Sequence, residues 1–93
     1  MSRVEVRYFY KLDCALCEAM ENQLGALMER HGLENQVMII SCDIENDSKW
    51  YDLYREYVPV LVVDGQEVCH YFLDEQELLD AISAVQDREA GRD

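Results

Sequence analysis

A pair of cysteines, Cys14 and Cys17, lies where the period of the hydrophobic pattern changes from two residues to between three and four. Residues 3–11 alternate with a period of two and are rich in β-forming residue types, which predicts a strand. From Cys14 onward the apolar residues recur at intervals of three and four until Gly32, which predicts a helix with a glycine cap. The sequence therefore places a dithiol at a strand-to-helix junction, where open α/β sheets present their active sites.

The rest of the chain continues to alternate between strands and helices. Residues 36–42 enclose a short apolar run that is typical of a strand buried on both faces. After it we expect a helix from Asn46 or Asp47 to about Tyr57, a strand over 60–63, a turn at Asp64-Gly65, a strand over 68–72 and a helix from Asp74 to Val85. Asp-Gly between two β-rich runs is a strong hairpin signal, and Asp74 with Glu77 forms a capping box.

This order of elements, βαβ, then α, then ββ, then α, predicts an α/β fold with a mixed four-stranded sheet flanked by helices. The 93 residues are enough for one small domain. We place this domain at residues 1–85 and expect residues 86–93 to form a frayed polar tail.

A stripe of large side chains marks the predicted second helix. Its members are Trp50, Leu53, Tyr54 and Tyr57. Helical spacing of this kind usually means packing against a sheet, so we expect the stripe to belong to the core. An aromatic platform for a substrate is the alternative.

The charge balance excludes two classes of partner. Twenty acidic and eight basic residues give a formal net charge of −12. The basic residues are scattered, whereas nucleic acids and anionic membrane surfaces require clustered positive charge.

The longest apolar run, residues 58–63, is too short to cross a bilayer, and charges within the first seven positions interrupt any secretory signal. We expect a monomer in the cytoplasm.

Four cysteines in a chain without a secretory signal favour metal or redox chemistry over a disulfide scaffold. Cys42 and Cys69 are isolated, so the second cysteine pair of a zinc ribbon is missing. In the predicted sheet these two residues lie on opposite edges, about 14 Å apart, and cannot bridge each other. We expect packed or half-exposed thiols, with a regulatory role for Cys69 as the alternative. We expect His31 at a helix end and His70 on a strand surface.

The spacing of the cysteine pair allows disulfide exchange. Residues three apart on a helix have Cβ atoms about 5–6 Å apart, close enough for a disulfide after a small rotation. The helix N-terminus favours the thiolate form of Cys14, which makes Cys14 the predicted nucleophile and Cys17 the resolving thiol. A nearby Lys11 would assist the thiolate, and Asp13 would oppose it. The alternative is that both cysteines only pack at the start of a helix.

Three segments then carry a family resemblance: Lys-Leu-Asp-Cys-Ala-Leu-Cys at 11–17, Val-Pro-Val-Leu at 58–61 and the Asp64-Gly65 turn. With these, the chain resembles glutaredoxins and thioredoxin-fold proteins over nearly its whole length, in particular small bacterial glutaredoxin-like proteins. The resemblance implies a thioredoxin-like, glutaredoxin-type fold. It also implies a cis Val58–Pro59 bond against the cysteine pair, with the backbone of Val58 offered to an extended substrate or to glutathione.

Around the cysteine pair, the sequence differs from both glutaredoxins and thioredoxins. Glutaredoxins carry Pro-Tyr between the cysteines and Gly-Gly followed by Asp near the last strand, whereas this chain has Ala15-Leu16 and the segment 69–74 there. Thioredoxins carry Trp before the first cysteine and Gly-Pro inside the pair, and this chain has neither. The partner is therefore not inherited from either class.

The leading functional hypothesis is a thiol-disulfide oxidoreductase or electron carrier of glutaredoxin type. Cys14 and Cys17 are the predicted catalytic residues, and Lys11, Val58 and Pro59 the predicted substrate contacts. No cofactor or metal is required. The expected partners are protein disulfides or a reductase, with glutathione as a candidate reductant. Two alternatives remain: a zinc or iron-sulfur module held through Cys14 and Cys17, and a noncatalytic adaptor of the same fold.

Overall fold

The computed structural model describes residues 3–91. Its elements are, in chain order, β1 (Val4–Tyr10), α1 (Ala15–Arg30), β2 (Val37–Asp43), the short 3-10 helix η1 (Ile44–Asn46), α2 (Ser48–Tyr54), β3 (Val60–Val63), β4 (Gln66–His70) and α3 (Glu75–Ala90). None of the helices in this described part has the length and apolar character needed to cross a membrane.

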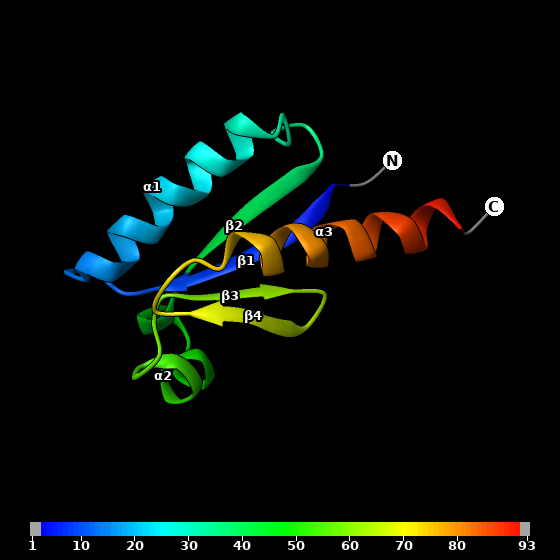
Figure 1. The fold of residues 1–93 in the computed structure, drawn as a ribbon. Helices are drawn as coiled ribbons and strands as arrows, with labels where there is room; N and C mark the ends of the chain where they lie inside the picture. Colours follow the sequence, from blue (N-terminus) through cyan, green and yellow to red (C-terminus); the bar gives the residue numbers. More distant parts are fainter. Residues whose placement is uncertain (1–2, 92–93) are drawn as a thin grey trace.

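The strands form one mixed sheet in the order β2-β1-β3-β4 (Figure 1). β1 pairs in parallel with β2, and the pairs β1–β3 and β3–β4 are antiparallel. A parallel βαβ unit is thus joined to an antiparallel hairpin, and the predicted fold class is confirmed.

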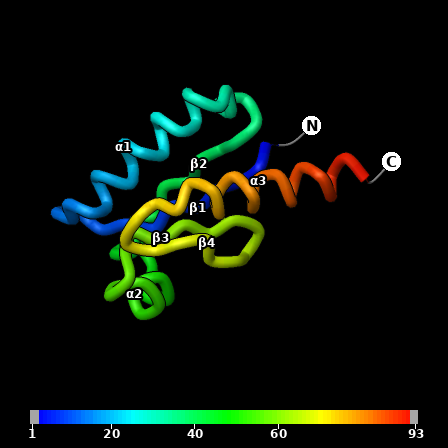
Figure 2. The backbone as a smooth tube through the Cα atoms, in the orientation of Figure 1, coloured from blue at the N-terminus to red at the C-terminus, as the bar shows by residue number. Residues whose placement is uncertain are grey.

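Helices α1 and α3 cover one face of the sheet (Figure 1), and α2 lies against the other. The burial pattern of β1 fits this arrangement, since Val4 and Val6 are buried and Glu5 and Arg7 are exposed, whereas Phe9 is buried against α2. A shift by one residue would move Val4 and Val6 to exposed positions, so this pattern fixes the register of the strand. Figure 2 shows that β1 begins and α3 ends at the end of the sheet farthest from the start of α1.

The predicted aromatic stripe is only half correct. The Phe9 ring packs against Trp50 at 5.5 Å and against Tyr54 at 4.4 Å between ring centroids. Leu53 and Tyr57, by contrast, are 61% and 46% exposed. α2 ends at Tyr54 rather than at about Tyr57, so Tyr57 lies outside the helix.

A proline limits how far the chain can continue as a helix after α2. The residue before a proline is sterically kept out of the helical region, so Val58 cannot continue a helix into Pro59. Between α2 and Pro59 the chain forms a turn, in which the N–H groups of Tyr57 and Val58 both donate to the Tyr54 carbonyl, at 2.8 and 3.0 Å. Tyr57 therefore belongs to a connecting loop.

The hairpin has the predicted turn. Asp64 and Gly65 have φ angles of 54° and 77°, the two positive values that a type I′ turn requires. The register then shifts between Leu61 and Val62, so that Val68 is an extra, bulged residue on β4. β4 ends at His70, two residues before its predicted end at Phe72, because Tyr71 adopts a φ of 65°.

The last helix begins as predicted and ends later. The Asp74 side chain caps α3 by accepting from the Glu77 N–H at 3.1 Å. The predicted frayed tail is wrong for residues 86–90, which continue α3 to Ala90. Gln86 is tied to Gln36 by a 2.8 Å side-chain hydrogen bond, and Arg88 pairs with Asp64. The final two residues of the predicted tail lie outside the described residues.

Candidate active site

Cys14 occupies the N-cap position of α1. Its backbone is extended, with φ −122°, and its Sγ accepts a hydrogen bond from the Cys17 N–H at 3.2 Å. Asp13, with a φ of 56°, turns the chain from β1 into the helix. The Cys14 sulfur therefore lies at the positive end of a 16-residue helix, beside an N–H group that no helical carbonyl can satisfy.

The two cysteines differ in their access to solvent. Their Cα atoms are 5.2 Å apart, and the sulfurs are joined as a disulfide. Cys14 is half-buried, whereas Cys17 is only 2% exposed. An incoming sulfur can thus reach Cys14 first, while Cys17 is positioned to attack from inside the protein.

Tyr8, which the alternation of residues 3–11 predicts only as a strand residue, holds the first turn of α1 against β1. Its hydroxyl donates to the Cys17 carbonyl at 2.6 Å, and its ring stacks on Tyr10 with a centroid distance of 5.3 Å. Burial, followed by the charge of Glu21, raises the pKa of Tyr8 to about 12. A buried tyrosine usually finds a partner for its hydroxyl, which is the signal that could have pointed to this contact.

A Tyr8→Phe variant is expected to lose about 1–3 kcal/mol of unfolding free energy at pH 7, because the Cys17 carbonyl loses its buried donor. The pKa of Tyr8 is raised from 10.0 to about 12 in the folded protein, so the folded state holds its proton more tightly between these values. Wild-type stability should therefore fall as pH rises from 10 to 12, and more steeply than in the variant. Urea denaturation across this pH range measures both effects. Parallel slopes for the two proteins would contradict the assignment.

The predicted substrate loop lies at the same end of the sheet as the cysteine pair. The Val58–Pro59 bond is cis, and both residues are buried. Val60, the next residue, pairs with Phe9 near the end of β1, and β1 leads directly to Cys14. Lys11 is exposed in the loop between them. The structure thus brings the five predicted site residues to one end of the sheet; their roles stay predictions.

The other two cysteines lie outside this site. Cys42 is on β2 and Cys69 on β4, the two opposite edges of the sheet. Burial raises the pKa of both thiols, and the nearby Arg7 guanidinium lowers that of Cys42 in part. Both are therefore protonated, weakly nucleophilic thiols at neutral pH. His31 ends α1 as predicted.

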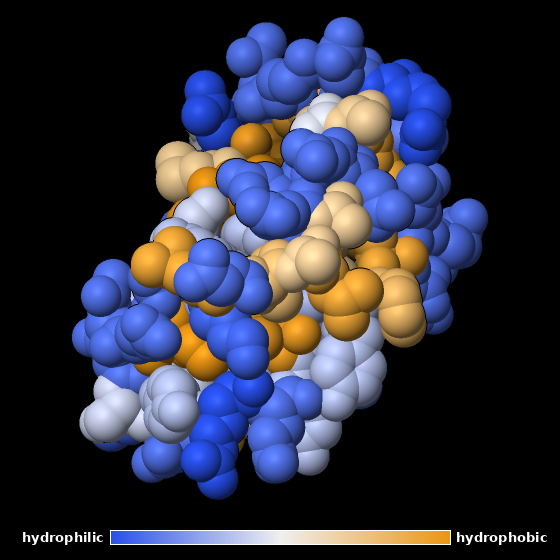
Figure 3. Space-filling view, turned by 90° about the vertical axis from the view of Figure 1, so that its left-hand side faces the viewer, coloured by the Kyte–Doolittle hydropathy of each residue, from blue (hydrophilic) through white to orange (hydrophobic). Residues whose placement is uncertain are grey.

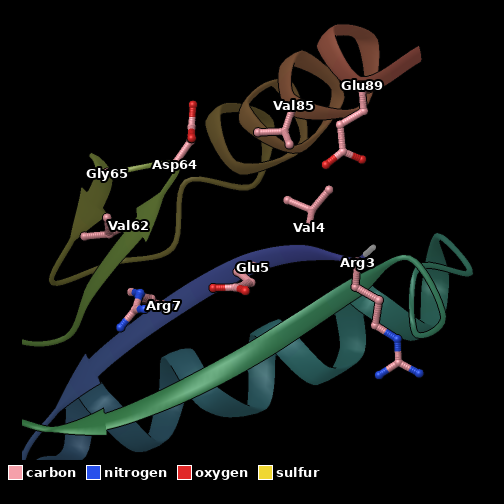
Figure 4. Close-up of a pocket in the computed structure, with 9 residues that line it drawn as sticks. All are labelled: Arg3, Val4, Glu5, Arg7, Val62, Asp64, Gly65, Val85 and Glu89. Carbon is pink, nitrogen blue, oxygen red and sulfur yellow. The ribbon is translucent and has the colours of Figure 1, made fainter. Parts of the chain in front are cut away.

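No set of three His, Cys, Asp or Glu side chains within residues 3–91 is arranged to hold a metal ion. A cavity of about 580 Å³ lies at the opposite end of the sheet, between β1, the hairpin turn and α3 (Figure 4). Its lining mixes both charges, with Arg3 and Arg7 against Glu5 and Asp64, and contains no cysteine.

Comparisons with known proteins identify a family that spans most of the chain. The family model of the glutaredoxin-like domain (DUF836) matches residues 5–83. A glutaredoxin-like protein of Dictyostelium discoideum is 26% identical over 77 residues, which are 81% of this chain and 71% of that protein.

Solved structures extend the comparison to the fold. A protein of Nitrosomonas europaea solved by NMR is 27% identical, with a TM-score of 0.69 over 88% of this chain and 94% of the other. Mitochondrial thioredoxin 3 of Saccharomyces cerevisiae, at 21% identity, has a TM-score of 0.59 over 90% of this chain and 80% of that one. The chain has the thioredoxin fold and belongs to the glutaredoxin-like domain family.

Proposed function

We propose that the protein is a thiol-disulfide oxidoreductase that cycles Cys14 and Cys17 between dithiol and disulfide. The observation that carries this proposal is the asymmetry of the pair: a half-exposed sulfur at the N-cap of α1, and a buried one whose Cα is 5.2 Å away. This arrangement supplies a nucleophile and an internal resolving thiol. Membership of the glutaredoxin-like family supports the same class of chemistry.

The reaction balances within the site. The Cys14 thiolate attacks one sulfur of a substrate disulfide, forms a mixed disulfide and releases the other substrate sulfur as a thiolate. The Cys17 thiol loses its proton, attacks the Cys14 sulfur and releases the second substrate thiolate. Two electrons pass from the cysteine pair to the substrate, and the two released thiolates take up protons.

The helix terminus favours the attacking form of Cys14. Its sulfur accepts the Cys17 N–H, a hydrogen bond that strengthens when the sulfur is negative. The positive end of α1 adds to this effect. Lys11, exposed three residues before Cys14, contributes a positive charge on the solvent side.

The cis-proline loop receives the substrate chain. The Val58 N–H already donates to the Tyr54 carbonyl at 3.0 Å, so an extended substrate would meet the carbonyl oxygen of Val58 rather than its N–H. Pro59 keeps this segment packed against the end of β1. The proposed partners are therefore protein disulfides, acted on by a monomer in the cytoplasm, where reduction of substrates is favoured.

The pair must be returned to the dithiol state by a thiol reductant, which is glutathione or the dithiol of a reductase. Glutathione would attack the Cys14 sulfur, and a second glutathione would release the adduct as glutathione disulfide. No resident cofactor takes part in either step.

A redox titration in glutathione buffers, trapped by alkylation and read by peptide mass, tests the proposal. We expect a reversible two-electron transition confined to Cys14 and Cys17. The Cys42 thiol, buried and with a raised pKa, should alkylate only after unfolding and serves as the internal control. Complete alkylation of Cys14 and Cys17 at every glutathione potential would contradict the proposed function.

A further inference from the structure

A cluster of exposed rings stands beside the cis-proline loop. We define the aromatic ridge as Tyr57, His70, Tyr71 and Phe72. Ring centroids are 5.6 Å apart for Tyr57 and His70, 4.8 Å for His70 and Tyr71, and 6.4 Å for Tyr57 and Tyr71. Phe72 is 70% exposed, the largest exposed fraction among the bulky apolar side chains of residues 3–91. Rings in such numbers on a surface mark an interaction site.

The aromatic ridge is held in place by its backbone. The Tyr71 N–H donates to the Pro59 carbonyl at 2.9 Å, and the Tyr71 hydroxyl donates to the Glu56 carbonyl at 2.6 Å. Tyr71 itself adopts a φ of 65°, which is uncommon for a residue with a bulky side chain. Two hydrogen bonds and a special backbone conformation therefore fix the position of Tyr71, whose ring contacts those of His70 and Tyr57.

The aromatic ridge and the cysteine pair share one end of the sheet. Val60 pairs with Phe9 on one side and with His70 on the other, so the ends of β1 and β4 lie on either side of the start of β3. Leu12 and Leu16 lie two residues before and after Cys14 in the sequence, and their side chains are 64% and 39% exposed. Figure 3 views this end of the molecule and shows apolar side chains across its middle, interspersed with hydrophilic ones.

The charges around this apolar surface are mainly negative. The three segments that form it, residues 11–18, 55–57 and 67–74, carry five acidic and two basic side chains. One of the two basic side chains, that of Arg55, lies over the ring of Tyr51 in α2, with its Cζ 5.9 Å from the ring centroid. A partner that approaches this end therefore meets a negative field, which adds to the net charge of −12.

We infer that the aromatic ridge, together with Leu12 and Leu16, docks an extended, lysine- or arginine-rich segment of the protein whose disulfide is reduced at Cys14. This inference rests on the proposed function and names its substrate class. Exposed rings bind guanidinium and ammonium groups over their faces and bury the aliphatic stems of the same side chains. The acidic residues steer such a segment to the site.

The test uses two synthetic peptides with the same disulfide and the same apolar residues, one flanked by lysines and one by glutamates. A small neutral disulfide, bis(2-hydroxyethyl) disulfide, serves as the reference substrate. The pre-reduced protein is mixed with each, and the rate of oxidation of the cysteine pair is measured. At low salt the cationic peptide should react at least about tenfold faster than the anionic one. Salt at about 0.5 M should remove most of this difference.

Phe72→Ser should slow the reaction with the cationic peptide about tenfold and leave the small disulfide unaffected. The matched control is Met38→Ser, which removes a side chain of 42% exposure from β2, outside the proposed docking surface. It should change neither rate. The inference would be overturned if the protein reduced the small disulfide but reacted equally fast with the two peptides. It would also be overturned if Phe72→Ser left the rate with the cationic peptide unchanged.

Failure to reduce any of the three disulfides would instead overturn the proposed function. Docking is then judged separately, by calorimetric titration with both peptides after their cysteines are replaced by serine. Tighter binding of the cationic peptide, by about tenfold or more, supports the docking surface. Equal binding of the two peptides, or none, overturns it.

Discussion

Replacing Cys14 with serine is expected to abolish disulfide reduction, lowering kcat/KM by about 10³-fold or more. A serine hydroxyl is not ionised at neutral pH and cannot form the sulfur-sulfur bond of the mixed disulfide. Serine is also a good N-cap, so its Oγ can replace the Cys14 Sγ as acceptor of the Cys17 N–H. The variant should therefore remain folded, and its circular dichroism spectrum and urea midpoint check this directly.

Cys17→Ser separates the two half-reactions. With Cys14 intact, attack on the substrate proceeds, but no internal thiol releases the mixed disulfide, so the adduct should accumulate and be visible by intact mass. The controls are Cys42→Ala and Cys69→Ala, which remove the thiols at the two sheet edges and should preserve turnover. Full activity in Cys14→Ser, or loss of activity in both edge variants, would disprove the assigned roles.

Phe9→Ala is expected to destabilise the protein by about 3–5 kcal/mol, because it removes a buried ring and leaves a cavity. The ring is 4% exposed and is the contact through which Trp50 and Tyr54 hold α2 on the sheet. A small domain has only about 5–15 kcal/mol of stability in total, so this loss is large. Urea denaturation followed by Trp50 fluorescence measures both the stability and the environment of α2.

Leu53→Ala is the matched control on the same helix. Leu53 is 61% exposed, so its truncation should change the unfolding free energy by less than about 0.5 kcal/mol. If Leu53→Ala and Phe9→Ala destabilised the protein equally, Leu53 would have to pack against the sheet as first predicted from its helical spacing.

The order of the elements could be predicted because each carries a local signal. The alternation of Val4, Val6 and Tyr8 with Glu5 and Arg7 predicts a strand, and the structure buries the first three and exposes the other two. The Asp64-Gly65 turn has a similar local cause, since only a few residue types tolerate two consecutive positive φ angles. The position of Cys14 at the helix start likewise follows from the change of period around it.

The ends of α2 and α3, which the local signals failed to predict, depend on the rest of the structure. The stripe on α2 gave no indication that the helix would stop at Tyr54. Residues 86–90 look polar and frayed in sequence, but contacts with Gln36 and Asp64, far away in the chain, accompany their continued helix. Neither contact can be inferred from the periodicity of the segment itself.

In the candidate site, too, some features follow from local sequence signals and others only from tertiary contacts. Cys14 and Cys17 are neighbours in sequence, and their spacing alone predicts a dithiol. The contact of Tyr8 with the Cys17 carbonyl requires α1 to lie over β1. The aromatic ridge requires β4 to follow β3 at the sheet edge, which brings His70 beside Tyr57. Such groupings depend on the order of strands, which no single segment encodes.

The bulge at Val68 makes the two edge strands of the sheet, β2 and β4, differ in regularity. β2 presents an uninterrupted row of seven residues, whereas on β4 the extra residue breaks the ladder between Leu61 and Val62 and increases the local twist. A straight strand from another molecule cannot align its N–H and C=O groups with such an edge over more than a few residues. The hairpin that carries part of the aromatic ridge is thereby protected from self-association through backbone pairing, even though it keeps apolar side chains exposed.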